Sequence, residues 1–109
     1  MGHLYLIGAI FFEIIATTAL KYAAGFTQLI PSITTLSGYV ASFYLLSLSL
    51  RTLPIGYTYA VWSAVGIISL AAIGALFMNE KIDLPGVIGM SFIVIGVVIL
   101  SGFSNMSDH

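Results

Sequence analysis

The chain has 109 residues, of which 60% are hydrophobic and 6% are charged, with a formal net charge of −1. Soluble domains carry about 25% charged residues, so this composition, with a mean hydropathy of +1.12, indicates an integral membrane protein. Each spanning helix takes about 20 apolar residues, so four spans leave no room for a nucleotide-binding or extramembrane catalytic domain. There is no Walker-type phosphate loop for an ATP-driven pump and no basic surface for nucleic acid.

Four long apolar stretches, separated by short polar breaks, predict an all-α membrane protein with a single four-helix transmembrane domain covering residues 1–109. Lipid cannot satisfy an open backbone, so spanning segments of this kind form helices. Pro31, Pro54 and Pro85 lie near expected helix starts, where the missing N–H costs little. Asp83 is expected to cap the last helix. The expected spans are 4–21, 30–50, 55–77 and 85–103, followed by a polar tail at 104–109.

The basic residues give almost no signal for orientation in the membrane. Four spans with short loops place both termini on the same side as Arg51, and place Lys21 and Lys81 on the other side. Cytoplasmic loops normally carry an excess of Lys and Arg, and this bias is too weak to fix a direction. We therefore predict dual topology and an antiparallel homodimer of oppositely inserted copies. The alternative is a single orientation that is poorly encoded.

Glu13 is the one charged residue in the interior of an expected span, close to the middle of residues 4–21. An intramembrane carboxylate costs a few kcal/mol to insert and indicates a functional site. The alternative is a neutral glutamic acid that hydrogen-bonds between helices. A carboxyl group can hold a proton or, once ionised, a cation. Competition between the two at Glu13 predicts proton/cation exchange with no cofactor.

The side chains expected around Glu13 suit a lipophilic organic cation. Spacings of three and four residues place Leu6, Ala9, Ile10 and Thr17 on its face of the helix. Aromatic faces attract cations, most strongly where water is excluded. The second and third spans supply the remaining pocket candidates, which are Tyr39, Ser42, Phe43, Tyr59 and Trp62.

Other interpretations of these residues stay open from the sequence. Tyr59 and Trp62 fit an interfacial aromatic belt, and Ser42 fits a hydrogen bond to its own helix. A metal site is not expected, because one carboxylate without His or Cys neighbours has too few ligands. An enzyme is not expected either, because Glu13 has no evident nucleophile, metal or second acid beside it.

Small residues mark two further features. Gly89 and Gly96 share one face of the fourth span with Ile93, and small residues allow helices to approach closely. We expect this face to form the dimer interface; packing within one monomer is the alternative. A glycine weakens a helix, and the third span has a candidate hinge at Ala64, Val65 and Gly66.

Three blocks of sequence carry a resemblance to a known family. The first, FFEIIATTALKYAAGFTQLIPS, includes Glu13 and Thr17, and the second, YVASFYLLSLSLRTLPIGYTYAVWSAVG, begins at Tyr39. The third is Asp83-Leu84-Pro85 followed by GMSFIVIGV. In this order and with these loop lengths, the chain resembles the small multidrug resistance transporters over essentially its whole length.

The resemblance implies antiparallel homodimers with dual topology and proton-coupled export of cations across a bacterial inner membrane. It implies that Glu13 is the essential carboxylate and that Tyr39, Tyr59 and Trp62 are the pocket aromatics. It also implies that the fourth span is the dimerisation helix and that the bend lies at 64–66.

The resemblance also bears on the subtype. Guanidinium exporters of this family typically have a tryptophan where this chain has Ala16, and tend to lack the tyrosine found here at Tyr39. Both differences favour the quaternary-ammonium, multidrug subtype. Ala64 and Ile30 depart from the multidrug pattern, at the bend and in the first loop. A guanidinium exporter remains the alternative, followed by a non-transporting membrane subunit.

Overall fold

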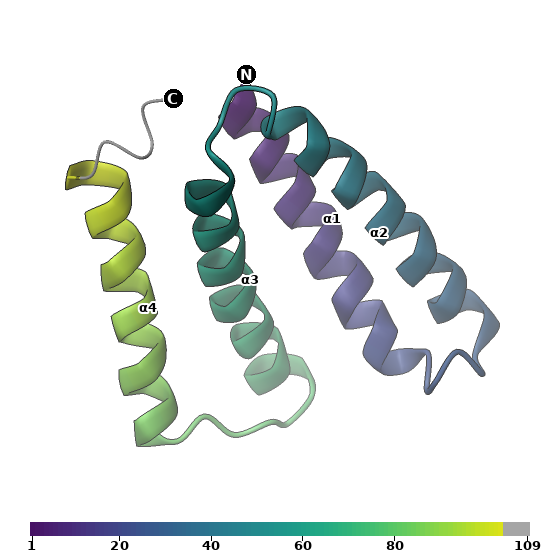
Figure 1. Ribbon diagram of the computed structural model, residues 1–109. Helices are drawn as coiled ribbons and strands as arrows, with labels where there is room; N and C mark the ends of the chain where they lie inside the picture. Colours follow the sequence, from purple (N-terminus) through teal and green to yellow (C-terminus); the bar gives the residue numbers. More distant parts are fainter. Residues whose placement is uncertain (104–109) are drawn as a thin grey trace. The chain divides into compact units, whose positions relative to one another are not determined.

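The regular structure of the chain is helical throughout the described residues, 1–103, of this computed structural model (Figure 1). The all-α prediction with four long helices is confirmed. The helices differ from the expected spans by at most two residues at either end, and the polar tail expected at 104–109 lies outside the described residues. They are α1 (Gly2–Tyr22), α2 (Leu29–Ser49), α3 (Ile55–Phe77) and α4 (Leu84–Phe103).

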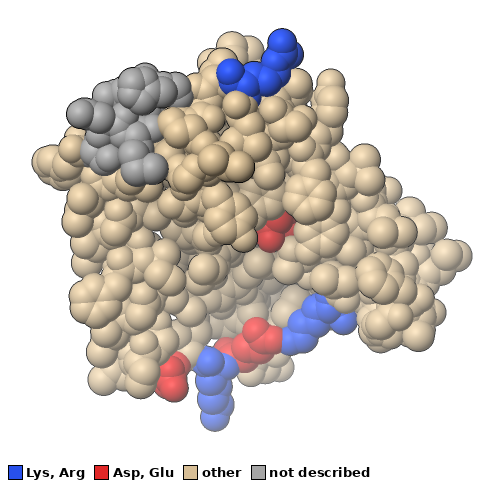
Figure 2. Space-filling model, viewed as in Figure 1, with Lys and Arg blue, Asp and Glu red and all other residues tan. Residues whose placement is uncertain are grey.

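All four helices are long and apolar enough to cross a membrane. They contain 20 to 23 residues, with mean hydropathies of 1.7, 1.4, 2.1 and 2.4 in chain order. At about 1.5 Å per residue, such helices match a hydrocarbon core of about 30 Å. Figure 2 shows a visible surface on which uncharged residues predominate.

The chain divides into two compact units. The first, Met1–Thr52, is a hairpin in which α1 and α2 pack side by side (Figure 1). The second begins at Leu53 and contains α3 and α4, which also contact each other. Each unit therefore joins two helices that are consecutive in the sequence.

The loop between α1 and α2 makes a left-handed turn. Ala24, Gly25 and Phe26 have φ angles of 49°, 72° and 66°. Glycine adopts this region freely, whereas alanine and phenylalanine are held there at some cost. The N–H groups of Thr27 and Gln28 both donate to the Ala23 carbonyl, at 2.9 and 3.1 Å. These bonds fix the turn and therefore the register of α2 against α1.

Small residues bring α1 and α2 close together. Ala16 and Gly38 are buried where the helices meet. A Cβ atom built at Gly38 would lie 2.8 Å from the Ala16 Cβ and 3.2 Å from the Phe12 carbonyl oxygen. Nearby, the buried Ser42 hydroxyl donates to the Ala9 carbonyl at 2.7 Å. The crossing is thus fixed both by packing and by a hydrogen bond between helices.

The connection between α3 and α4 is built from local caps. The N–H groups of Met78 and Glu80 both donate to the Gly74 carbonyl, at 3.1 and 3.0 Å. Asn79 between them has a φ of 57°, a conformation that asparagine tolerates better than most residues. The Gly86 N–H donates to Asp83 Oδ1 at 2.9 Å, which confirms the predicted cap of α4.

Candidate functional site

A chain of three polar side chains connects α1 to α2. The Thr17 hydroxyl donates to Oε1 of Glu13 at 2.9 Å. The same Thr17 oxygen lies 2.6 Å from the hydroxyl oxygen of Tyr39. Glu13 and Thr17 are four residues apart and so share one face of α1. The register of the hairpin brings Tyr39 to that face.

The donors and acceptors that each hydroxyl group offers set the direction of the hydrogen bonds among these three side chains. A threonine hydroxyl has one proton to donate and two lone pairs that accept. Because Thr17 gives its proton to Glu13, the Tyr39 hydroxyl must donate to Thr17 in this arrangement. The two donated bonds therefore point in one direction, from Tyr39 through Thr17 to the Glu13 carboxylate.

The two oxygens of Glu13 differ in their surroundings. Glu13 lies close to the midpoint of the 21-residue helix α1 and is half-buried. Oε1 accepts the Thr17 bond, whereas Oε2 is buried without a hydrogen-bond partner among the described residues. An unsatisfied buried oxygen carries a free-energy cost, which a proton or a cation would relieve.

The Tyr39 ring is supported from its own helix. It stacks on Phe43 with ring centroids 5.8 Å apart and an interplanar angle of 14°. The two residues are four positions apart on α2, so this contact forms on a regular helix. Phe43 is exposed. Phe43 thus packs against the tyrosine, and its predicted role in a substrate pocket stays a prediction.

The apolar residues predicted around Glu13 belong to the packed interior of the chain. Leu6, Ala9 and Ile10 are all buried. Ser42 is buried too, and its hydroxyl bonds the Ala9 carbonyl. The structure therefore brings Ser42 and Ala9 together, and a contact between any of these residues and a substrate stays a prediction.

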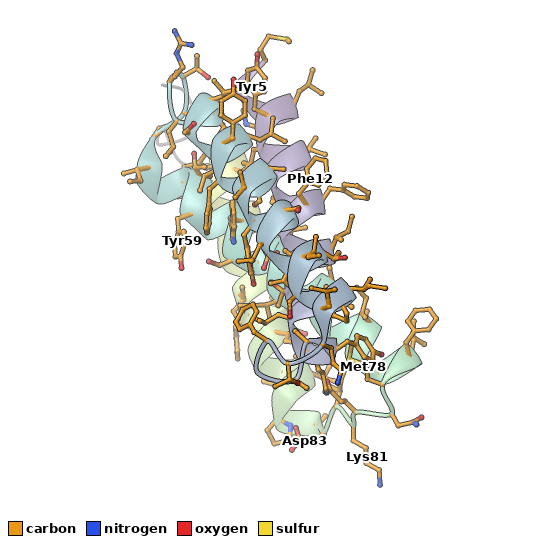
Figure 3. All side chains as sticks on the ribbon, turned by 90° about the vertical axis from the view of Figure 1, so that its right-hand side faces the viewer. Tyr5, Phe12, Tyr59, Met78, Lys81 and Asp83 are labelled. Atoms are coloured by element: carbon orange, nitrogen blue, oxygen red, sulfur yellow. The ribbon has the colours of Figure 1, made fainter. Side chains whose placement is uncertain are left out.

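The pocket aromatics predicted in the third span lie in the second unit. Tyr59 is 65% exposed and projects away from the α3 ribbon (Figure 3). Trp62, one turn further along α3, is half-buried. The hinge candidates at 64–66 lie within the unbroken helix α3. The roles of these residues in a pocket or a hinge stay predictions.

The predicted interface residues of α4 lie on an open surface. Gly89, Ile93 and Gly96 are all exposed. A Cβ atom built at Gly89 or Gly96 would meet nothing within 4 Å. Space of this kind is what a close-packed partner helix needs, and the dimer interface itself stays a prediction.

The second unit also contains two hollows between α3 and α4, of about 260 and 400 Å³. Aliphatic side chains such as Ile68 and Val94 line both, with Ser69 in the first and Ser91 in the second. Neither lining includes a carboxylate to attract a cation. The polar chain at Glu13 is the better candidate site for that reason.

The sequence interpretation placed Thr17 on the same helix face as Glu13 and named Tyr39 as a pocket residue, but it missed the bond between Tyr39 and Thr17. The spacing of four residues signals the contact between Thr17 and Glu13. The bond from Tyr39 depends on the register of α2 against α1, for which the sequence gives no direct signal.

Known proteins resemble this chain along almost all of its length. The model of the small multidrug resistance protein family matches residues 1–93. The quaternary ammonium compound-resistance protein QacF of Klebsiella aerogenes is 46% identical, covering 97% of this chain and 96% of its own. QacE of Escherichia coli is 47% identical, with coverages of 99% and 98%. The multidrug transporter EmrE of Escherichia coli K12 is 43% identical, with coverages of 98% and 97%. The chain therefore belongs to the small multidrug resistance family and is a multi-pass protein of the bacterial inner membrane.

Proposed function

We propose that this chain is a proton-coupled antiporter that exports hydrophobic and quaternary organic cations, with protons and cations competing for Glu13. The observation that carries the proposal is the half-buried carboxylate near the midpoint of α1, with one oxygen held and the other unpartnered among the described residues. Ionisable groups at such depth mark ion and substrate pathways. The names of QacF, QacE and EmrE support multidrug efflux.

The exchange needs no energy source other than a proton gradient. An ionised Glu13 holds a cation, and protonation removes the negative charge and releases it. Two oppositely inserted copies supply two such carboxylates and the inverted symmetry that larger transporters encode within one chain. Rearrangement of this antiparallel homodimer then opens the shared site to each side of the membrane in turn. Tyr59 and Trp62 contribute aromatic faces to the cation.

The packing of α1 against α2 supports the multidrug subtype. Ala16 is buried against Gly38, where even one added carbon atom at Gly38 would be too close. A tryptophan at position 16, as in the guanidinium exporters that this family includes, would require the two helices to separate. Tyr39, which those exporters tend to lack, bonds Thr17 here. We therefore favour bulky organic cations over guanidinium as substrates.

Transport by purified protein in liposomes tests this function. With a pH gradient, the wild type should move tetraphenylphosphonium against its concentration gradient, and Glu13→Gln should not, because an amide cannot exchange a proton for a cation. Glu80→Gln is the matched control, since it makes the same change in the loop after α3. It should transport as the wild type does. Proton-driven transport by Glu13→Gln at the wild-type rate would contradict the proposal.

The same liposomes distinguish the two subtypes. Guanidinium replaces tetraphenylphosphonium in a parallel assay with and without the pH gradient. We expect the phosphonium to be transported and guanidinium to be a poor substrate. The reverse preference would assign the chain to the guanidinium exporters.

A further inference from the structure

We propose that Tyr39 is a positioning residue that acts on Glu13 through Thr17. In this proposal, the Tyr39 hydroxyl holds the Thr17 hydroxyl against Oε1 of Glu13. Oε2 is then the oxygen that exchanges a proton for a cation. The inference rests on the proposed function, because it assigns the exchange to one atom of the same carboxylate.

The geometry of Tyr39, Thr17 and Glu13 distinguishes the two carboxylate oxygens. The two bonds measure 2.9 and 2.6 Å, and Thr17 has only one proton to donate. With Tyr39 as the donor to Thr17, Oε1 remains an acceptor. A proton on Oε1 would require Thr17 to turn its own proton away from this oxygen and to donate it elsewhere. These hydrogen bonds therefore favour protonation of Glu13 at Oε2 rather than at Oε1.

The Thr17 hydroxyl has a competing acceptor in its own helix. A threonine inside a helix readily bonds the backbone carbonyl three or four residues earlier, and in α1 the fourth such residue is Glu13 itself. Thr34 and Thr35 make bonds of this kind on α2, to Ile30 and Pro31. Thr17 instead bonds the Glu13 side chain while contacting Tyr39. The Thr17 oxygen is thus shared between the Glu13 carboxylate and the Tyr39 hydroxyl.

Tyr39 is distinct among the titratable groups of its helix. α2 carries two, Tyr39 and Tyr44. Tyr39 is half-buried and reaches Thr17, whereas Tyr44 is exposed. On α1, the other titratable side chains lie in its first and last turns, away from Glu13; they are His3, Tyr5, Lys21 and Tyr22.

A double-mutant cycle measures whether Tyr39 acts through Thr17. Tyr39→Phe removes the hydroxyl and keeps the ring that stacks on Phe43. Thr17→Val removes the other hydroxyl at nearly constant shape. Tetraphenylphosphonium binding to the full-length purified protein is measured as a function of pH for each single variant and for the double variant. Tyr44→Phe is the matched control, and Thr17→Ser is the conservative rescue.

Each single variant should weaken binding about fivefold, the effect expected for one hydrogen bond. The double variant should bind no more weakly than Thr17→Val, and all three should show the same altered pH profile. Thr17→Ser and Tyr44→Phe should stay within about twofold of the wild type. Effects that multiply to about 25-fold in the double variant would overturn the inference, since Tyr39 would then act directly on the cation. So would a loss in Thr17→Ser equal to that in Thr17→Val.

Infrared difference spectroscopy tests the contact independently of transport. The carboxyl band assigned to Glu13, by its loss in Glu13→Gln, should shift equally in Tyr39→Phe and Thr17→Val. A band shifted by Thr17→Val and unmoved by Tyr39→Phe would refute the positioning role. Absence of proton-coupled transport by the wild type would refute the proposed function. The infrared measurement would still test the contact, because it does not depend on transport.

Discussion

Ser42 is the residue at which a side chain of α2 hydrogen-bonds the backbone of α1. Its bond to the Ala9 carbonyl is buried and measures 2.7 Å. The Ser47 hydroxyl on the same helix is exposed and bonds the Tyr44 carbonyl three residues earlier at 2.6 Å. The two serines thus make bonds of similar length, one between helices and one within a helix.

We expect Ser42→Ala to lower the free energy of unfolding by about 1 kcal/mol, because hydrogen bonds between membrane helices contribute at about this level. Ser47→Ala should change it by less than about 0.5 kcal/mol. Denaturation of the purified protein by sodium dodecyl sulfate, followed by circular dichroism, measures both. Equal losses in the two variants would show that the bond between helices contributes nothing specific.

Single residues also show which parts of the site the sequence predicts. Glu13 is recognisable because a charge inside an apolar run is costly and therefore informative. The bond from Tyr39 to Thr17 was missed, because it depends on how far α2 slides along α1. That register is set by a left-handed turn in which Ala24 and Phe26 have φ values uncommon for their residue types. These residue types do not predict such a turn from the sequence.

At the scale of helices, α1 and α2 approach each other so closely at Gly38 that there is no space for a larger side chain. Gly38→Ala gains up to about 1 kcal/mol of helix propensity but places its methyl group against the Ala16 side chain and the Phe12 carbonyl. Overpacking of this kind costs about 1 to 3 kcal/mol. We therefore expect a net loss of stability in the same denaturation assay.

Gly102→Ala is the control for this prediction. It makes the same change on α4, where the added carbon atom would meet nothing within 4 Å. Its stability should be equal to that of the wild type or slightly higher, because only the propensity term remains. If Gly38→Ala were as stable as Gly102→Ala, the close contact between α1 and α2 would not constrain the hairpin.

The helices themselves were the most predictable elements. Continuous apolar runs and the polar breaks between them gave their ends to within two residues, and Asp83 gave the cap of α4. The conformation of the loop after α3 was less predictable. There Glu80 folds back so that its carboxylate occupies the space a side chain at Gly74 would need, and a contact of this kind carries no periodic signal.

At the scale of the whole molecule, dual topology has a direct test, because the chain contains no cysteine. Thr27→Cys and Thr52→Cys place single thiols in the loops at opposite ends of α2. A membrane-impermeant maleimide applied to intact cells should label about half of each variant, because the basic residues give little orientation bias. Full labelling of one variant and none of the other would establish a single orientation.

The two-unit organisation has a consequence for how the protein is made. The whole polar chain of Glu13, Thr17 and Tyr39 lies in the first unit, Met1–Thr52. A ribosome that adds about 5 to 20 residues per second completes this unit before α3 is synthesised. Glu13 and Thr17 therefore enter the membrane together on α1, and the next helix to leave the ribosome supplies Tyr39 within seconds.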